Sequence, residues 1–166
     1  MLWRIRPKFT NKYLFKTLVI MIEKANEKDI PELLKMGECF FVEAKQNEFF
    51  EWDEGNFHLA LKDLTKNPFV FLVARNKDEI IGAVCAILFP LWFNRSIIVA
   101  QELFLYVKPE SRKGIGLKLL KKLEEEVKNR NAKNLIMLSF EEMPSLDKLY
   151  ERNGYRKSEK TVIKRL

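Results

Sequence analysis

The sequence predicts an α/β domain built around one mixed β-sheet, and three observations lead to that expectation. The chain has 166 residues, the size of a single domain. Hydrophobic residues make up 47% and charged residues 32%, the balance of a folded globular protein rather than a disordered chain. Along the chain, short β-branched and aromatic runs alternate with segments of helical periodicity. This alternation is typical of layered α/β domains.

The composition excludes several classes of protein. No apolar run reaches the roughly 18–20 residues that span a bilayer, so we expect no membrane partner. The two cysteines, Cys39 and Cys85, are far apart and lie in apolar surroundings, which argues against a disulfide scaffold and a zinc site. His58 is the single histidine, so a two-histidine metal motif is excluded and we expect no metal.

Positive charge is concentrated at the start of the chain. The net charge is +7, and residues 1–20 contain five basic residues and no acidic one. Because the remainder is nearly neutral, nucleic-acid binding is not expected. Residues 1–20 are interpreted as a loose extension before a true start at Met21, as a helix that packs on the body, or as a targeting peptide. Residues 21–166 are expected to form the domain.

The first part of the domain is expected to hold a strand and two helices. Residues 22–25 form a plausible short strand. Asp29 can cap a helix, and Glu32 stands three residues later as in a capping box. Asp53 can cap a second helix with an apolar face at helical spacing, which Asn67-Pro68 ends.

Three strands are expected next. Residues 69–75 and 79–89 are β-branched and aromatic, and residues 76–78 between them suit a hairpin turn. Residues 90–95 are expected to form a loop. Residues 96–107 are a long apolar run, which predicts a central strand covered on both faces.

The last part of the chain is expected to contain two helices and three strands. One helix opens at Gly114, and residues 135–140 form the next strand. A short helix starts at Pro144. Residues 155–157 and 161–164 are expected to make a final pair of strands.

The turn between the central strand and the following helix carries the most informative pattern. Backbone N–H groups at such a turn converge, and the helix dipole adds positive potential, so the turn can bind an anion. Two glycines allow close approach to a diphosphate. The pattern is neither a P-loop nor the dinucleotide fingerprint, which needs a third glycine. The residues expected around the anion are Arg112, Lys113, Gly114, Ile115, Gly116, Leu117 and Lys118.

This turn resembles motif A of the GNAT superfamily of N-acetyltransferases, an apolar strand ending in V-x-P followed by [QR]-x-x-G-x-[GA] and a helix. Residues 149–155 (LYERNGY) resemble the family's L-Y-x-x-x-G-[FY] signature. The resemblance covers about residues 21–166 and implies a central mixed, largely antiparallel sheet with helices on both faces. Ser111 stands at the [QR] position, and residues 141–145 lack the asparagine that many members direct toward pantetheine.

The resemblance implies a cytoplasmic enzyme that transfers acetyl from acetyl-CoA to a primary amine by direct attack in a ternary complex. The acceptor is an amine of a small molecule or a protein, and a homodimer is left open. Two strands splay apart in this family, so the backbone of residues Leu105, Tyr106 and Val107 should face the pantetheine. Tyr150 matches the family's proton donor. Glu102 is the candidate base, with Gln101 and a water chain as alternatives.

Two other classes compete with this interpretation. A non-catalytic acyl-CoA-binding module that regulates a partner is compatible with Ser111 and the missing asparagine. A nucleic-acid-associated protein would hold phosphates with residues 1–20. Five aromatic residues are expected either to line the acceptor pocket or to seal the first two helices on the sheet, namely Phe49, Phe50, Trp52, Trp92 and Phe93. Four acidic residues among them could favour a cationic acceptor, namely Glu43, Glu48, Glu51 and Asp53.

Overall fold

The computed structural model describes residues 20–141 and 143–164, and it contains one five-stranded sheet with the order β1-β2-β3-β4-β5. The first three pairs of neighbours are antiparallel, and β4 pairs with β5 in parallel. The expected mixed, largely antiparallel sheet is therefore confirmed. The strands are β1 (Ile20–Lys24), β2 (Phe69–Asn76), β3 (Glu79–Leu91), β4 (Asn94–Val107) and β5 (Asn134–Ile136).

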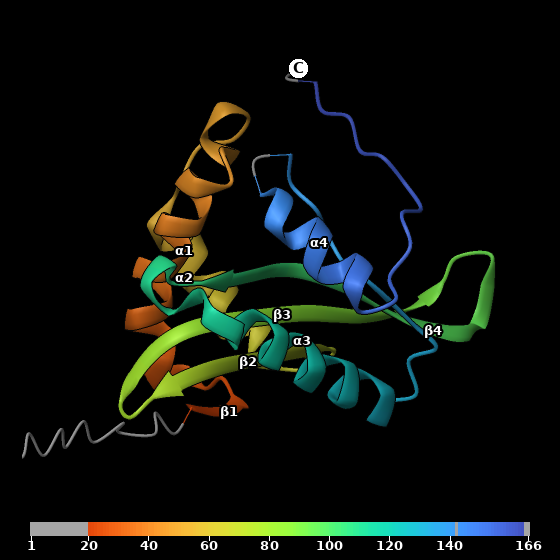
Figure 1. Cartoon of the computed structure of the whole chain (residues 1–166), viewed down its shortest axis with the longest axis horizontal. Helices are drawn as coiled ribbons and strands as arrows, with labels where there is room; N and C mark the ends of the chain where they lie inside the picture. The colour runs from red at the N-terminus through yellow and green to blue at the C-terminus, as the bar shows by residue number, and fades with distance from the viewer. Residues whose placement is uncertain (1–19, 142, 165–166) are drawn as a thin grey trace, which may run out of the picture.

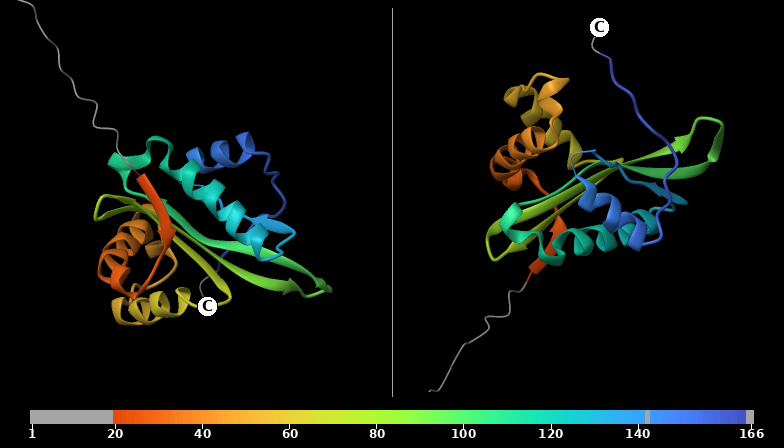
Figure 2. Two further views of the ribbon diagram at one scale, coloured as in Figure 1. Left: turned by 90° about the horizontal axis from the view of Figure 1, so that it is seen from below. Right: turned by 45° about the horizontal axis from the view of Figure 1, so that its top comes forward.

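Helices cover both faces of this sheet, as the sequence predicts (Figures 1 and 2). On one face lie α1 (Ile30–Glu43) and α2 (Glu54–Leu64). On the other lie α3 (Arg112–Asn129) and α4 (Pro144–Arg152). The expected cap at Asp53 is present, because its carboxylate accepts a hydrogen bond from the N–H of Asn56 at 2.8 Å.

The core consists of two apolar layers, one on each face of the sheet. Under α3 the layer is built from β-branched and leucine side chains that are fully buried, such as Leu72, Val84 and Leu120. Under α1 and α2 it is built from residues such as Val73 and Ile80. None of the helices formed by the described residues is long and apolar enough to cross a membrane.

Asp29 precedes α1 but does not cap it with its side chain. Its carboxylate instead accepts from the backbone N–H of Asn26 at 3.0 Å and pairs with the guanidinium of Arg75. The carboxylate of Glu32 does not reach back to the cap either. It accepts from the N–H of Ile80 at 2.9 Å and so ties α1 to β3.

Three expectations about strands were wrong. Residues 90–95 are not a loop, because β3 and β4 continue to Leu91 and Asn94 and leave only Trp92 and Phe93 in the turn. Residues 135–140 form a strand only as far as Ile136, where the pairing with β4 stops. Residues 155–164 contain no strand, and most of them are charged or polar and exposed.

The predicted basic segment, residues 1–20, lies outside the described residues except for Ile20. That residue begins β1 and pairs with Asn76 of β2.

Candidate active site

A bulge in β4 divides the strand into two halves with different side-chain orientations. Cys85 pairs with Phe104 and Ala86 pairs with Glu102, so Leu103 has no partner on β3. Such an extra residue resets the alternation of side chains between the two faces. Ala100 and Leu105 consequently both lie on the α3 face, although five positions separate them. The bulge directs Glu102 toward α4, where it meets Tyr150.

The parallel pairing between β4 and β5 extends over three residues only, from Val99 to Gln101 on β4. Beyond this point the two segments separate. Lys108 donates its N–H to the carbonyl of Ile81 at 2.9 Å, and residues of an antiparallel pair alternate in direction along the strand. The backbone groups of Leu105 and Val107 therefore point to the free edge of β4, while those of Tyr106 point to β3.

The carboxylate of Glu102 lies where β4 and β5 separate. It is fully buried, and its Oε2 accepts hydrogen bonds from the N–H of Leu138 at 2.9 Å and the hydroxyl of Tyr150 at 3.1 Å. Its Oε1 has no partner among the described residues. Burial disfavours the charged form and raises the pKa of Glu102 to about 7, despite the two hydrogen bonds that act in the opposite direction. Gln101, the adjacent alternative, is half-buried.

Tyr150 is positioned on α4 by aromatic packing as well as by Glu102. Its ring centroid lies 5.6 Å from that of Tyr155, and its side chain is almost completely buried. Burial, and then the neighbouring Glu102, raise the pKa of Tyr150 well above its ordinary range. The phenol therefore keeps its proton at neutral pH. The hydroxyl of Tyr155 makes a separate hydrogen bond to Glu124 of α3, at 3.0 Å.

The glycine-containing turn leads into α3 through an irregular stretch of backbone. Pro109–Ser111 form a short 3-10 turn, and the helical path is interrupted at Lys113 and Gly114. Gly114 has φ +81°, a conformation that disfavours side chains, and nothing lies within 4 Å of the place where its Cβ would be. The regular part of α3 follows, so its first N–H groups face outward without partners inside the helix.

The other residues of the turn differ in whether their side chains are buried or exposed to solvent. Ile115 is buried in the core under α3, so only its backbone can meet a ligand. The side chains of Lys113, Leu117 and Lys118 are exposed. A Cβ on Gly116 would meet only the side chain of Leu149 on α4, at 3.7 Å, so α3–α4 packing does not demand a glycine there. The turn thus combines an open backbone with basic side chains, which suits an anion.

Arg112 connects this turn to α1. Its Nε donates to the carbonyl of Val107 at 3.0 Å, and one terminal nitrogen pairs with both carboxylate oxygens of Glu43. The guanidinium also lies 5.7 Å from the ring centroid of Tyr106. Arg112 therefore holds α1 against the free edge of β4.

An aromatic cavity of about 460 Å³ lies between α1, α2 and the sheet. Phe40 is central to this region, because its ring contacts Phe104, Tyr106 and Phe140 with centroids 5.8–6.3 Å apart. Since Phe140 belongs to the segment that separates from β4, this cluster borders the open edge of β4. The lining includes Phe40, Phe41, Trp52, Phe57, Phe104 and Tyr106, with Glu51 and Asp53 among its polar residues.

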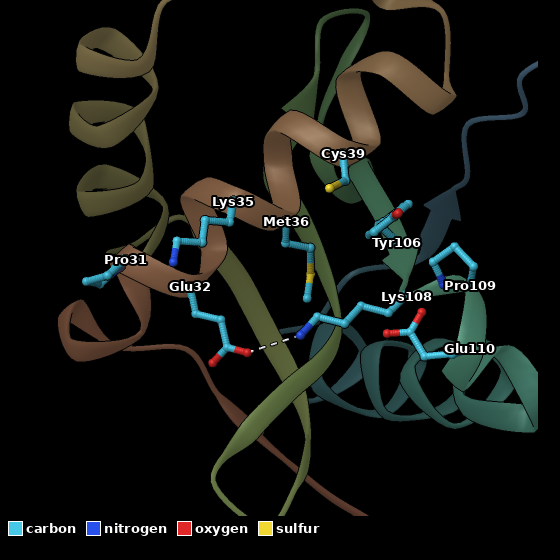
Figure 3. Close-up of a pocket in the computed structure, with 9 residues that line it drawn as sticks. All are labelled: Pro31, Glu32, Lys35, Met36, Cys39, Tyr106, Lys108, Pro109 and Glu110. Atoms are coloured by element: carbon cyan, nitrogen blue, oxygen red, sulfur yellow. Dashed lines mark hydrogen bonds and ion pairs between the residues drawn. The ribbon is translucent and has the colours of Figure 1, made fainter.

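A second cavity, of about 610 Å³, lies between α1 and the connection from β4 to α3 (Figure 3). Two of its charged residues, Lys108 and Glu32, are paired with each other. Lys108 contacts Glu32 at 3.3 Å and, outside the cavity, Glu79 at 2.8 Å. Met36 and Tyr106 line both cavities and separate them.

The predicted aromatic residues divide into three groups. Trp52 lines the aromatic cavity and packs on Phe57, with ring centroids 4.9 Å apart. Phe49 and Phe50 are exposed beside it. Trp92 and Phe93 form the tip of the β3–β4 hairpin, far along the strands from the bulge, and are 87% and 67% exposed.

Sequence reasoning missed two features of the site. Gly37 lets α2 approach α1, because a Cβ there would lie 2.3 Å from the ring of Phe57. A glycine in the middle of an amphipathic helix was the available signal. The position of the bulge, at Leu103, was the second, because a glutamate inside an apolar run suggests a bulge in this strand without locating it.

Residues 32–155 match the sequence profile of the family described as Acetyltransferase (GNAT) family. No match to a curated protein sequence was found.

Solved structures share the fold at low sequence identity. A predicted acetyltransferase with acetyl-CoA from Clostridium acetobutylicum is 18% identical, with a TM-score of 0.72 over 88% of this chain and 96% of the other. A ribosomal-protein-alanine N-acetyltransferase from Brucella melitensis biovar Abortus 2308 is 18% identical, with a TM-score of 0.70 over 89% and 99%. An aminoglycoside acetyltransferase from an uncultured soil metagenomic sample, in complex with sisomicin, is 19% identical, with a TM-score of 0.64 over 89% and 94%.

Proposed function

The chain belongs to the GNAT acetyltransferase family, and on that premise we propose that it transfers the acetyl group of acetyl-CoA to a primary amine by direct attack in a ternary complex. The observation that carries the proposal is the free edge of β4. At Leu105 and Val107 this strand has no strand partner on its β5 side among the described residues, although the carbonyl of Val107 accepts from Arg112. The strand leads into the glycine-containing turn and lies beside the hydroxyl of Tyr150. These three parts match a thioester with a long amide arm and a diphosphate.

The residues present fit acetyl-CoA. The first N–H groups of α3 and the exposed Lys113 and Lys118 would hold the diphosphate, with Gly114 and Gly116 leaving room for it. The backbone of Leu105 and Val107 would hold the pantetheine arm as a neighbouring strand does. Arg112 would reach the diphosphate only by leaving Glu43.

Acetyl-CoA supplies an activated thioester carbonyl, and the chain supplies position and proton transfer. A free N–H of β4 polarises the carbonyl oxygen. Tyr150 donates its proton to the departing sulfur. Its high pKa keeps the phenol protonated at neutral pH until that step. The attacking nitrogen must lose a proton, which water takes. Glu102, the predicted base, is fully buried behind the hydroxyl of Tyr150, so it does not reach the amine directly.

The aromatic cavity is proposed to receive the body of the acceptor. Its aromatic lining suits an apolar or aromatic group, and its carboxylates Glu51 and Asp53 suit a cationic amine. The named structural neighbours include an enzyme acting on aminoglycosides and one acting on a ribosomal-protein alanine. Both acceptors are amines, which supports the chemical class.

A screen of free CoA release from acetyl-CoA across a panel of amines tests the function directly. The panel should include aryl-alkyl amines, polyamines and peptides with free N-termini. We expect the highest rates with a primary amine that carries an apolar body. Tight acetyl-CoA binding without CoA release by any amine would instead favour the non-catalytic acyl-CoA-binding module.

The cofactor site has its own test. Gly114→Glu places a negative charge where the diphosphate would lie, so acetyl-CoA binding measured by calorimetry should fall at least roughly 10²-fold. Gly114→Asn is the matched control, because asparagine tolerates positive φ and adds no charge. The assignment fails if both variants bind acetyl-CoA as the wild type does.

A further inference from the structure

The buried carboxylate of Glu102 lacks the partners that an ionised group requires. Its Oε2 receives two hydrogen bonds, whereas Oε1 is buried with no partner among the residues described. An orphaned oxygen on a charged carboxylate is far more costly than one on a neutral carboxyl group. The geometry therefore favours the protonated form.

The groups around Glu102 favour the same form. Tyr150 faces it from α4, and the backbone N–H of Leu138 faces it from the segment after β5. Asp147 of α4 adds negative potential at Tyr150, as Glu124 of α3 does at Tyr155. The named ionisable neighbours are thus phenols or carboxylates, which do not stabilise a second negative charge.

We propose that Glu102 is protonated in the resting protein and passes this proton to Tyr150 as Tyr150 protonates the departing sulfur. Glu102 then acts as a positioning and proton-holding residue behind Tyr150, without touching the amine. The inference rests on the proposed acetyl transfer.

The proton transfers balance in one sequence. The amine nitrogen bonds to the thioester carbon, the carbon–sulfur bond breaks, and its electron pair stays on sulfur. In the reacting arrangement the phenolic O–H turns from Oε2 to that sulfur and gives it its proton, and the protonated Oε2 donates its own proton to the phenolic oxygen across the same 3.1 Å contact, in the direction opposite to the resting hydrogen bond. The excess proton on nitrogen leaves to water. Glu102 ends as a carboxylate. It regains a proton through Tyr150 after the products have left the site.

This arrangement removes the main difficulty with Tyr150 as an isolated donor. A tyrosinate in this buried site, beside Asp147 and Tyr155, would be strongly disfavoured. Simultaneous proton supply from Glu102 avoids it and leaves the charge on a carboxylate, which holds it more readily.

The substitution Glu102→Gln separates proton transfer from structure. The glutamine carbonyl can take the place of Oε2 and accept from both the N–H of Leu138 and the hydroxyl of Tyr150, so both hydrogen bonds and the packing are preserved. We expect kcat to fall roughly 10²-fold with KM for acetyl-CoA unchanged. In the wild type, kcat should decrease as the pH rises above about 7, where Glu102 loses its proton. That decrease should be absent in Glu102→Gln.

A second measurement needs no turnover. Infrared spectroscopy of the protein alone should show a protonated-carboxyl C=O band below about pH 7 that disappears as the pH rises. The band should be missing in Glu102→Gln and present in Tyr155→Phe, which alters the neighbouring tyrosine–glutamate contact instead.

The outcomes distinguish the two proposals. Wild-type kcat in Glu102→Gln, a lowered kcat that keeps the decrease at high pH, or no carboxyl band in the wild type would each overturn the relay while leaving acetyl transfer intact. A wild-type protein that shows the band but releases no CoA with any amine would overturn the proposed function, and the relay with it.

Discussion

The two edges of β4 are built from the same strand but in opposite ways. Toward β3 the antiparallel pairing runs from Asn94 to Val107 and tolerates two register shifts. Toward β5 the pairing is parallel and covers only three residues of β4. Beyond them, the carboxylate of Glu102 accepts a hydrogen bond from the backbone N–H of Leu138. At the first edge, backbone groups of β4 form hydrogen bonds with the backbone of β3. At the second edge, backbone groups beyond Gln101 have no described strand partner.

This difference assigns stability and chemistry to separate parts of one sheet. Residues on the β1–β3 side are buried by apolar contacts on both faces, so changing them should alter folding more than rate. The side chains that act at the open edge, Glu102 and Tyr150, are polar, and one carboxylate oxygen of Glu102 has no hydrogen-bond partner among the described residues. Changing them should therefore alter the rate more than folding. Variants on each side test this separation.

The largest expected effect is that of Tyr150→Phe at the open edge. The change keeps the ring and removes only the hydroxyl, so kcat should fall roughly 10²–10⁴-fold. Affinity for acetyl-CoA should be almost unchanged, because the contact is used mainly in the transition state. Single-turnover kinetics should be used so that slow product release does not hide the effect.

Tyr155→Phe is its matched control. It also removes a tyrosine hydroxyl bonded to a glutamate, at 3.0 Å, on the same side of the sheet. Both variants should lose a similar small amount of stability, about 1 kcal/mol. Equal kcat values for the two variants would place Tyr150 outside the mechanism and leave solvent as the proton donor.

The next largest effect is expected in the part of the sheet formed by β1, β2 and β3. Leu72 is 1% exposed on β2, between β1 and β3, so Leu72→Ala should lower the free energy of unfolding by about 2–5 kcal/mol. Its kcat per folded molecule should match the wild type. Chemical denaturation measures the first quantity, with Leu59→Ala on the exposed face of α2 as the control. A large loss of kcat in folded Leu72→Ala would break the proposed separation.

Local sequence patterns predicted the part of the sheet away from the open edge, and the helices, well. Runs of β-branched and aromatic residues identified β2, β3 and β4, helical spacing identified α1 to α3, and Pro144 marked the start of α4. These elements are specified by which residues are apolar, information that lies within short windows of the sequence. A turn leading into α3 was predictable for the same reason, because two glycines close together mark it, whereas the positive φ of Gly114 became known only from the structure.

The open edge was predicted less well, because contacts distant in sequence determine it. β5 ends at Ile136 because the Glu102 side chain, 36 residues before Leu138, replaces a strand partner. Nothing within residues 135–140 indicates that replacement. The bulge at Leu103 likewise depends on pairing with β3. Similarly, residues 155–164 have strand-like spacing but no described partner strand.

The smallest expected effect concerns the stability cost of the open edge. Burial raises the pKa of Glu102 from 4.5 to about 7, so the folded state holds this proton more tightly than the unfolded chain. Stability from this group is therefore fully present below pH 4.5 and is lost as the pH rises toward 7. At about 1.4 kcal/mol per pKa unit, the loss is at most on the order of 3–4 kcal/mol.

Glu102→Gln cannot titrate, so it isolates this contribution. Thermal melts of both proteins should show the wild type losing stability relative to Glu102→Gln between about pH 5 and about pH 8. Glu159→Gln, at an exposed carboxylate, removes the same charge without burial and should keep the wild-type pH dependence. A constant difference between the wild type and Glu102→Gln would mean that folding leaves the proton affinity of Glu102 unchanged. The edge of β4 that faces β5 would then carry no electrostatic cost, and the contrast between the two edges would rest on hydrogen bonding alone.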